Sequence, residues 1–389
     1  YVALTLVLGL FPYVGWAQSM EERLSAAMKA NEIVGLHSTV VMLDGDRIAE
    51  AYFQGEDERW GTPIGSIDHG PQTLHDLRSV TKSVVGLLYG IALSEGAVPS
   101  LDTPLLDLFP EYADLRDGTK RDEITVEHAL TMQMGTEWDE SLPYTDPRNS
   151  EIAMELAEDR YRFVLGRPMV TEPGTIWTYN GGAVALIAKL IADGTGQEID
   201  TFARTRLLDP LGIETFEWVR GADGVPSAAS GLRLTARDLA KIGKMIAQNG
   251  SYNGQEIVPP SWLEASFRTA ATIQEGFDYG FLWYLTKGPG GDPILIAVGN
   301  GGQRDLSSRP LQGITTIRML GRHLSAFCWI LQSQKSAGTA SNDREALLRR
   351  KQTSVHTAAF VTSGSQCEFA AVFLNVSSCG CYNRIPRLR

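Results

Sequence analysis

Apolar positions divide the chain into strand-like runs near both ends and helix-like runs between them. Near the start, the segments His37–Leu43 and Arg47–Phe53 flank Asp44-Gly45, a dipeptide that favours a tight hairpin turn. Late in the chain, Tyr279–Leu285 and Ile294–Gly299 are apolar runs of strand length. Strands that come early and late, with helices between them, predict an α/β layer made from both ends of the chain and a helical insertion.

The clearest helical pattern runs from Val80 to Leu93. This segment has no proline, and its apolar residues recur at helical spacing in an almost wholly apolar surround, which predicts a buried helix that begins near Ser79. Three other helical patterns are Met20–Asn31, Gly182–Ile191 and Leu234–Ile246. The region from Gln54 to Gln72 is rich in Gly, Asp and Pro, and we expect a loop there.

These patterns, with the charge balance, predict four regions. Residues 18–95 and 226–304 are expected to form the sheet region, and residues 96–225 a mainly helical region. Residues 1–17 resemble the apolar part of a secretory signal whose start is missing, although a buried N-terminal helix is the alternative. The signal implies a periplasmic or secreted protein. The apolar run is too short for a stable membrane span.

Charge and cysteine content change abruptly after Arg304. From Asp305 onwards there are 11 basic and 4 acidic residues, which leaves 24 basic and 42 acidic residues before it. All four cysteines also lie in this part, without a metal-binding spacing. Residues 305–389 therefore form a tail of unclear structure, and its first residues lack the pattern of a central strand. We hypothesise a reading-frame shift near the Arg304 codon; an inserted domain is the alternative.

The overall composition is that of a globular protein. Apolar residues make up 43% of the chain and charged residues 21%, and the formal net charge is −11. The negative balance argues against general nucleic-acid binding, because a polyphosphate partner requires a basic surface. The sequence specifies no oligomeric state.

The start of the Val80–Leu93 helix carries the candidate chemistry. Ser79 and Lys82 are three residues apart, so their side chains share a face at the first turn. A lysine amine held there in apolar surroundings should lose its proton more readily and activate the serine hydroxyl. The alternative is a serine that caps the helix, followed by a solvated lysine.

Two further segments have weaker signals. Tyr179 lies in a turn before a buried helix, where its phenol can face a cleft and its pKa could fall beside a lysine and a helix N-terminus. The glycine-rich segment Gly299–Gln303 follows an apolar strand, so a substrate could approach its backbone and an oxyanion could bind its N–H groups. The alternatives are a packing tyrosine and a hairpin turn.

The order and spacing of these three motifs resemble the penicillin-recognising serine hydrolases. The class C β-lactamase-like branch, with the family VIII carboxylesterases and 6-aminohexanoate-dimer hydrolases, is the nearest in pattern. The resemblance runs from about Met20 to Gln303 and includes the connecting segments Leu101–Pro104, Pro173–Tyr179 and Ser230–Leu239. It implies an antiparallel sheet flanked by helices with a helical insertion, as in β-lactamases and transpeptidases.

The resemblance also implies roles for individual residues. Ser79 would be the acylated nucleophile, and Lys82 and Tyr179 would share the proton transfers. The backbone N–H groups of Ser79 and Gln303 would bind the oxyanion. The residues expected to contact the substrate are Asn180, Asn300, Gly301 and Gly302.

Two departures from the family pattern affect the expected substrate. The second motif is commonly Tyr-x-Asn, but Gly181 stands at its third position here. The third motif usually opens with Lys or His, and Asn300 stands there instead. The missing cation favours a small ester or neutral amide over a carboxylated substrate. No metal or cofactor is implied, because the protein supplies nucleophile, base and oxyanion donors. The alternatives are a non-catalytic penicillin-binding-like sensor, and an inactive product with an aberrant C-terminus.

Overall fold

The computed structural model describes residues 21–30, 33–43, 45–287, 293–300, 304–308 and 314–317. The chain divides into two units, of which one comprises residues 1–36 and 318–389 and the other residues 37–317. In the first unit, the described residues include a helix over 21–29, within the predicted amphipathic segment. All of the following concerns the second unit.

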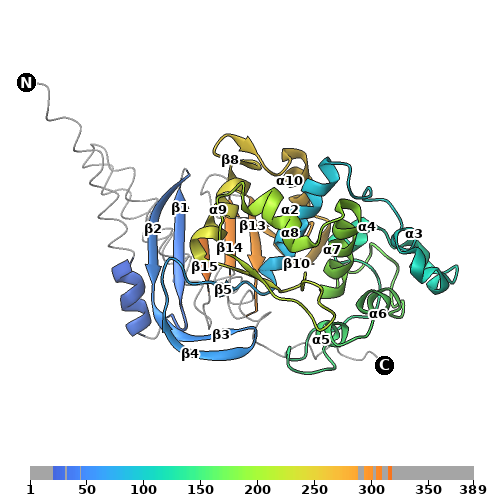
Figure 1. The fold of residues 1–389 in the computed structure, drawn as a ribbon, viewed down its shortest axis with the longest axis horizontal. Helices are drawn as coiled ribbons and strands as arrows, with labels where there is room; N and C mark the ends of the chain where they lie inside the picture. The colour runs from blue at the N-terminus through green and yellow to red at the C-terminus, as the bar shows by residue number, and fades with distance from the viewer. Residues whose placement is uncertain are drawn as a thin grey trace, which may run out of the picture. The chain divides into compact units, whose positions relative to one another are not determined.

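The second unit is built on an eight-stranded antiparallel sheet (Figure 1). Its strand order is β10-β11-β12-β13-β14-β15-β1-β2, so strands from both ends of the unit are neighbours in one sheet. The strands are β1 (Ser38–Leu43), β2 (Asp46–Tyr52), β10 (Ala271–Gln274), β11 (Phe277–Tyr279), β12 (Tyr284–Lys287), β13 (Pro293–Val298), β14 (Arg304–Ser308) and β15 (Ile314–Ile317). The predicted fold class, an antiparallel sheet made from both ends of the chain, is confirmed.

The structure confirms one predicted strand feature and overturns another. The predicted hairpin forms between β1 and β2, with Gly45 in the left-handed region at φ 83°. The expectation that no central strand follows Arg304 is wrong, because β14 pairs with β13 on one side and β15 on the other. Backbone pairing on both sides holds a strand there although its sequence does not alternate. The tail from residue 318 lies outside the described residues, and the reading-frame hypothesis stays a prediction for it.

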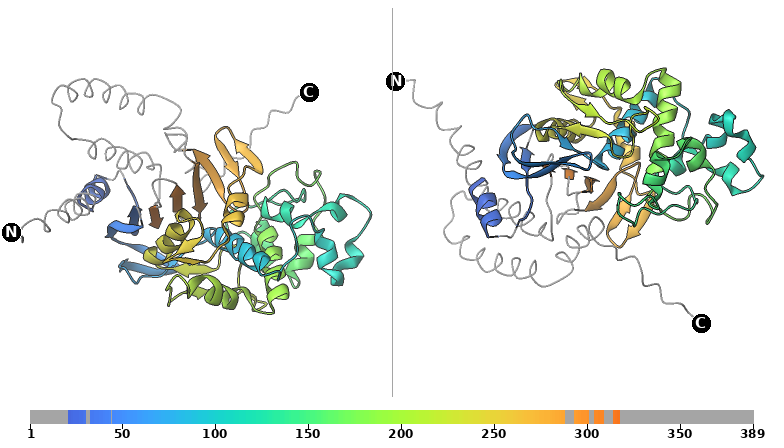
Figure 2. Two further views of the ribbon diagram at one scale, coloured as in Figure 1. Left: turned by 90° about the horizontal axis from the view of Figure 1, so that it is seen from above. Right: turned by 60° about the horizontal axis from the view of Figure 1, so that its bottom comes forward.

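A helical section separates the early strands from the late ones. Figure 1 shows α3, α4, α5 and α6 together on the side of the unit away from β1 and β2, and Figure 2 shows the same separation from two other directions. The section consists of α3 (Leu105–Leu108), the 3-10 helices η1 (Pro110–Leu115) and η2 (Lys120–Glu123), α4 (Val126–Leu130), α5 (Ser150–Glu155), α6 (Arg160–Leu165), α7 (Gly181–Thr195), α8 (Ile199–Ala203) and the π-helix η3 (Arg204–Leu208).

Helix α2 (Val80–Ser94) connects the helical section to the sheet. It packs against α7 and contacts β13, and every residue from Val80 to Ala92 is buried. Helix α9 (Ala236–Ala247) packs on β1, β14 and β15, as its amphipathic pattern predicts, and Thr235 caps it. Helix α10 (Pro260–Ser266) brings Trp262 against α2, where the indole Nε1 donates to the Gly86 carbonyl at 3.0 Å.

The region predicted as a loop is instead a polar hairpin. Strands β3 (Gln54–Arg59) and β4 (Thr62–Asp68) pair in antiparallel fashion, with a register shift after Asp57. Only Asp57 among the residues of β3 is buried, and none of β4 is, so the hairpin has no apolar alternation that a sequence pattern could reveal. Two small sheets complete the unit: β5 (His75–Asp76), β7 (Leu232–Leu234) and β6 (Glu217–Trp218), and the pair β8 (Ser251–Tyr252) and β9 (Gln255–Glu256).

Among the residues described, none of the helices combines the length and the apolar character needed to cross a bilayer.

The contact of α2 with α10 leads to a stability prediction. A Cβ at Gly90 would overlap the Trp262 ring, and the bond from Trp262 to Gly86 keeps the ring in place. Ala usually stabilises a helix interior relative to Gly by about 0.5–1 kcal/mol, whereas overpacking costs about 1–3 kcal/mol. We therefore expect Gly90→Ala to lower the free energy of unfolding, measured by urea denaturation. Gly70→Ala is the matched control, because nothing lies near its Cβ position; equal effects of the two changes would contradict the packing argument.

Candidate active site

Ser79 lies at the start of α2 with its hydroxyl turned to Lys82. Its backbone is helical, at φ −66° and ψ −7°, and its side chain makes no capping hydrogen bond. Lys82 Nζ donates to Ser79 Oγ at 3.2 Å, and Lys82 is only 2% exposed. The alternative of a capping serine and a solvated lysine is therefore wrong, and the two side chains share the first turn as predicted.

The surroundings of Lys82 are polar rather than apolar, which corrects the sequence-based expectation. Besides Ser79 Oγ, Nζ donates to Glu151 Oε2 at 3.1 Å and to the Ala229 carbonyl at 2.8 Å. The three N–H donors of an ammonium thus match three acceptors. Lys82 and Glu151 form an ion pair, and both side chains are nearly inaccessible to water, so the pair is buried.

Glu151 is the residue that occupies the space left by Gly181. It lies in the first turn of α5, where Asn149 caps the helix, and its Oε1 accepts from Ser230 Oγ at 3.1 Å. A Cβ at position 181 would overlap Glu151 Oε2. The departure of the second motif from Tyr-x-Asn therefore has a physical reason. A carboxylate from another helix contacts the lysine, and only glycine leaves room for it.

Tyr179 reaches the nucleophile from the turn before α7. Its hydroxyl shares a hydrogen bond with Ser79, and its ring centroid lies 5.0 Å from Lys82 Nζ. Burial raises the pKa of Tyr179 well above its usual value, and the carboxylates of Glu140 and Glu151 raise it further, against the lowering effect of the Ser79 bond. The expectation that this pKa falls is wrong, so Tyr179 is a neutral phenol at neutral pH.

Glu140 is a second carboxyl group near Tyr179. Its Oε1 accepts from Trp138 Nε1 and from the backbone N–H of Gly181, both at 2.6 Å, and its Oε2 accepts from Tyr144 at 2.7 Å. Burial, together with the nearby Glu151 carboxylate, raises the pKa of Glu140 to about 7 despite these donors and Lys82. The Glu140 carboxyl group therefore changes its protonation state near neutral pH.

The remaining predicted site residues are placed in different ways. Asn180 is buried, and its side-chain oxygen accepts from the Ala183 N–H at 2.9 Å to cap α7. Asn300 is exposed in a turn that follows β13. Gly301, Gly302 and Gln303 lie outside the described residues, so the oxyanion site at Gln303 and the substrate-binding roles stay predictions.

Sequence reasoning did not identify Glu140 and Glu151. Both lie in or next to a proline-containing connection where isolated acidic residues are usually solvated, and no fixed spacing relates them to Ser79. The contact of Lys82 with Glu151 joins residues 69 positions apart. The one indirect signal was Gly181, whose missing side chain leaves space for another group.

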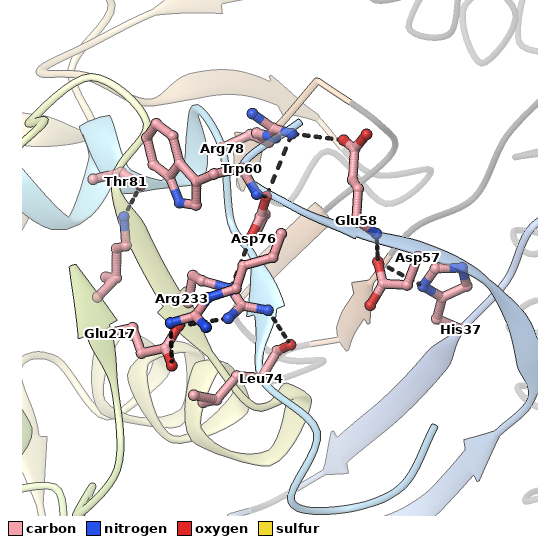
Figure 3. Close-up of polar contacts among 12 residues, drawn as sticks. His37, Asp57, Glu58, Trp60, Leu74, Asp76, Arg78, Thr81, Glu217 and Arg233 are labelled. Carbon is pink, nitrogen blue, oxygen red and sulfur yellow. Dashed lines mark hydrogen bonds and ion pairs between the residues drawn. The ribbon is translucent and has the colours of Figure 1, made fainter. Parts of the chain in front are cut away.

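A network of charged groups holds the backbone before Ser79 (Figure 3). Arg78 has a left-handed backbone at φ 51°, which is unfavourable for a residue with a side chain. Its guanidinium Nη2 lies 2.6 Å from Glu58 Oε1 and 3.3 Å from Asp76 Oδ2. Arg233 then joins Asp76, at 2.7 Å, to Glu217. These ion pairs favour the strained turn that brings Ser79 to the helix start.

The sequence matches a known family and a characterised relative. The model of the family described as Beta-lactamase matches residues 20–347, past the Arg304 boundary at which the motif resemblance ends. A 6-aminohexanoate-dimer hydrolase from Paenarthrobacter ureafaciens is 26% identical over 227 residues, which is 54% of this chain. The aligned region spans only 56% of that relative, just over half of its length.

Solved structures share the fold. A family VIII carboxylesterase has a TM-score of 0.60 at 17% identity, with 78% of this chain and 91% of the other covered. A penicillin-binding protein homologue from Caulobacter crescentus has a TM-score of 0.59 at 18% identity, with the same coverage of 78% and 91%. At this level of identity, the likeness establishes the fold alone.

The Lys82–Glu151 pair can be tested with a double-mutant cycle. Glu151→Ala leaves a buried ammonium without its carboxylate, which should lower the free energy of unfolding by about 3–5 kcal/mol. Gly181→Asn alone should also destabilise the protein, because its side chain overlaps Glu151. In the double variant, the asparagine oxygen can accept from Lys82, so we expect a favourable coupling of about 0.5–3 kcal/mol. Glu155→Ala combined with Gly181→Asn is the control. Coupling of equal size in that pair would contradict the idea that the new asparagine replaces Glu151 as the acceptor for Lys82.

The raised pKa of Glu140 predicts a pH effect on stability. Between the unfolded value near 4.5 and the folded value of about 7, the folded protein binds more protons than the unfolded chain. Its free energy of unfolding should therefore fall as the pH rises through this window. Glu140→Gln keeps an acceptor and a donor at the site but does not titrate. Between about pH 5 and about pH 8, we expect its free energy of unfolding, measured by urea denaturation, to fall less than that of the wild type. Glu137→Gln, an exposed change in the same loop, is the control; if both variants follow the wild type, Glu140 does not titrate as described.

Proposed function

Because the chain belongs to the Beta-lactamase family, we propose that it is a serine hydrolase that cleaves a small ester or amide through an acyl-enzyme on Ser79. The observation that carries the proposal is the contact of Ser79 Oγ with both Lys82 and Tyr179 at the N-terminal end of α2. A hydroxyl that is partly accessible and contacts an amine and a phenol has the setting of an activated nucleophile.

The proton transfers follow from the neighbours of Ser79. The Lys82 ammonium first passes a proton to Glu151, and the neutral amine then takes the Ser79 proton as the serine oxygen attacks the substrate carbonyl. Tyr179, as a neutral phenol, donates a proton to the leaving oxygen or nitrogen. Water then attacks the acyl-enzyme and gives a proton to the Tyr179 phenolate, while Lys82 returns a proton to Ser79 and regains its own from Glu151, so that the acid is released and the site is restored. Backbone N–H groups of Ser79 and Gln303 would bind the oxyanion.

The charges near Ser79 favour a substrate without a carboxylate at the scissile bond. In the described part of the chain, the three nearby cations all contact acidic groups: Lys82 with Glu151, Arg78 with Glu58, and Arg233 with Asp76. Glu140 adds further negative charge above its pKa of about 7. A substrate carboxylate would therefore meet repulsion rather than a free cation, which supports a neutral ester or amide.

The names of the relatives agree with this substrate class. One relative is named a dimer hydrolase of 6-aminohexanoate, and a structural neighbour is a family VIII carboxylesterase. We extend amide or ester cleavage from them to this chain as a proposal. A periplasmic or secreted location is likewise proposed from residues 1–17, which lie outside the described residues.

Covalent labelling tests the proposed nucleophile directly. A fluorophosphonate probe should label the wild-type protein once, and Ser79→Ala should abolish both labelling and hydrolysis of p-nitrophenyl esters. Ser83→Ala is the matched control. It lies one turn further along α2 and donates to the Leu282 carbonyl at 2.7 Å, so labelling should persist. Tyr179→Phe should reduce kcat/KM by about 10²–10⁴.

Three results would contradict the proposal. Labelling that survives Ser79→Ala would move the nucleophile elsewhere. A folded wild-type protein that neither reacts with the probe nor cleaves esters, amides or β-lactams would favour the non-catalytic sensor. Full activity of Tyr179→Phe on every substrate that the wild type cleaves would remove its role as proton donor.

A further inference from the structure

Three histidines and an aspartate gather at a second place in the unit, outside the Ser79 site. His37 precedes β1, Asp57 is the buried residue of β3, His69 follows β4 and His75 begins β5. Each side chain offers one ligand atom, and these four atoms lie within 4.8 Å of one another. All four residues are buried, with exposures between 1% and 8%. Figure 3 shows His37 beside Asp57 in this cluster.

The hydrogen bond of His69 to the backbone defines the protonation of its ring. His69 Nδ1 lies 2.7 Å from the Phe53 carbonyl oxygen, which can only accept, so Nδ1 carries the proton. In a neutral ring, Nε2 then presents a lone pair. That atom lies 3.4 Å from Asp57 Oδ2, another acceptor. Two acceptors that face each other in a buried site require a cation or a second proton between them.

The arrangement of the rings favours a metal ion over a proton as that cation. His37 and His69 are stacked at 3.9 Å between centroids, and His75 lies 5.2 Å from His69. A proton satisfies one pair of acceptors, whereas a divalent ion accepts a lone pair from each of three imidazoles and from the carboxylate. Two charged rings in this stack would repel each other without a second carboxylate among the four residues.

We propose that His37, His69, His75 and Asp57 bind one divalent transition-metal ion, with zinc the best match, as a structural site. Zinc binds His nitrogen and Asp oxygen and takes four ligands in a tetrahedron at structural sites, and three nitrogens and one carboxylate oxygen supply such a set. With metal–ligand bonds of about 2.0–2.2 Å, tetrahedral ligand atoms are about 3.4 Å apart. The four atoms lie within 4.8 Å of one another, so each pair needs to approach by about 1.4 Å at most, which rotation of the rings provides.

Groups around the cluster support the ligands. The His69 N–H bond to a carbonyl is the usual partner of a metal-binding histidine, because it directs the other nitrogen at the ion. Asp57 Oδ1 accepts from the Glu58 N–H at 2.9 Å. A Cβ at Gly55 would lie 2.9 Å from His37 Nε2, so the glycine leaves space for that ring.

The site would fix the polar β3–β4 hairpin, which has little apolar surface of its own to hold it. It is also connected to the nucleophile. Glu58 follows Asp57 and pairs with Arg78 at 2.6 Å, and Arg78 directly precedes Ser79. Metal binding would therefore favour the strained Arg78 backbone, as a positioning effect on Ser79 rather than as part of the reaction.

Cobalt substitution tests the site in the full-length protein. After dialysis against a chelator, one equivalent of Co²⁺ should give the visible absorption of a tetrahedral ion, without the thiolate charge-transfer band that cysteine ligands in the tail would add. His69→Gln should weaken binding by about 100-fold or more in competition with a chelator. His128→Gln is the matched control, since this half-buried histidine only caps α4, a role that glutamine also fills.

The measurement on the wild type decides the proposal even if His69→Gln does not fold. Absence of one equivalent of tetrahedral Co²⁺, together with no rise in Tm on adding Zn²⁺, would overturn it and favour a protonated histidine cluster. A cobalt spectrum with thiolate bands, or equal binding by His69→Gln and His128→Gln, would also overturn it. Folding of each variant is checked by circular dichroism. Fluorophosphonate labelling is a separate readout, so failure of the metal site and failure of the Ser79 chemistry are distinguishable.

Discussion

The buried ion pair of Lys82 and Glu151 is the interaction on which the rest of the site depends. It joins α2 to α5 by a contact between two side chains that are almost fully removed from water. Such a pair stabilises a structure only when its remaining donors and acceptors are also satisfied. Here Ser79 Oγ and the Ala229 carbonyl accept the other two hydrogen bonds of the Lys82 ammonium, and Ser230 donates to Glu151. The nucleophile therefore belongs to the same network that makes the burial of both charges tolerable.

This network constrains residues that take no part in chemistry. Gly181 is required because a side chain there would occupy the position of the Glu151 carboxylate. The start of α7 is also near Glu140, which accepts from the Gly181 N–H. Burial raises the pKa of Glu140, and the nearby Glu151 carboxylate raises it further, against the effect of Lys82. Burial raises the pKa of Tyr179, and the same two carboxyl groups raise it further, so the phenol stays protonated.

The backbone on the other side of Ser79 is held by a second set of ion pairs. Arg78 adopts a left-handed conformation that its side chain contacts stabilise, through Glu58 on β3 and Asp76 on β5. The hairpin of β3 and β4 thus has a role that its polar sequence does not suggest. It carries Glu58 to Arg78, and it carries Asp57 to the three histidines.

The sequence by itself determined the elements whose signals are local. The Val80–Ser94 helix, the hairpin at Gly45 and the helix after Thr235 follow from periodicity and caps, because hydrogen bonds four residues apart or a two-residue turn define them. The spacing of Ser79 and Lys82 likewise fixes their contact at one helical turn. Tertiary structure alone decided the partners of these residues. Glu151 contacts Lys82, β14 pairs between β13 and β15, and four residues distant in the sequence form the histidine cluster. Contacts of this kind depend on how separate elements pack together, and no pattern along one segment encodes that packing.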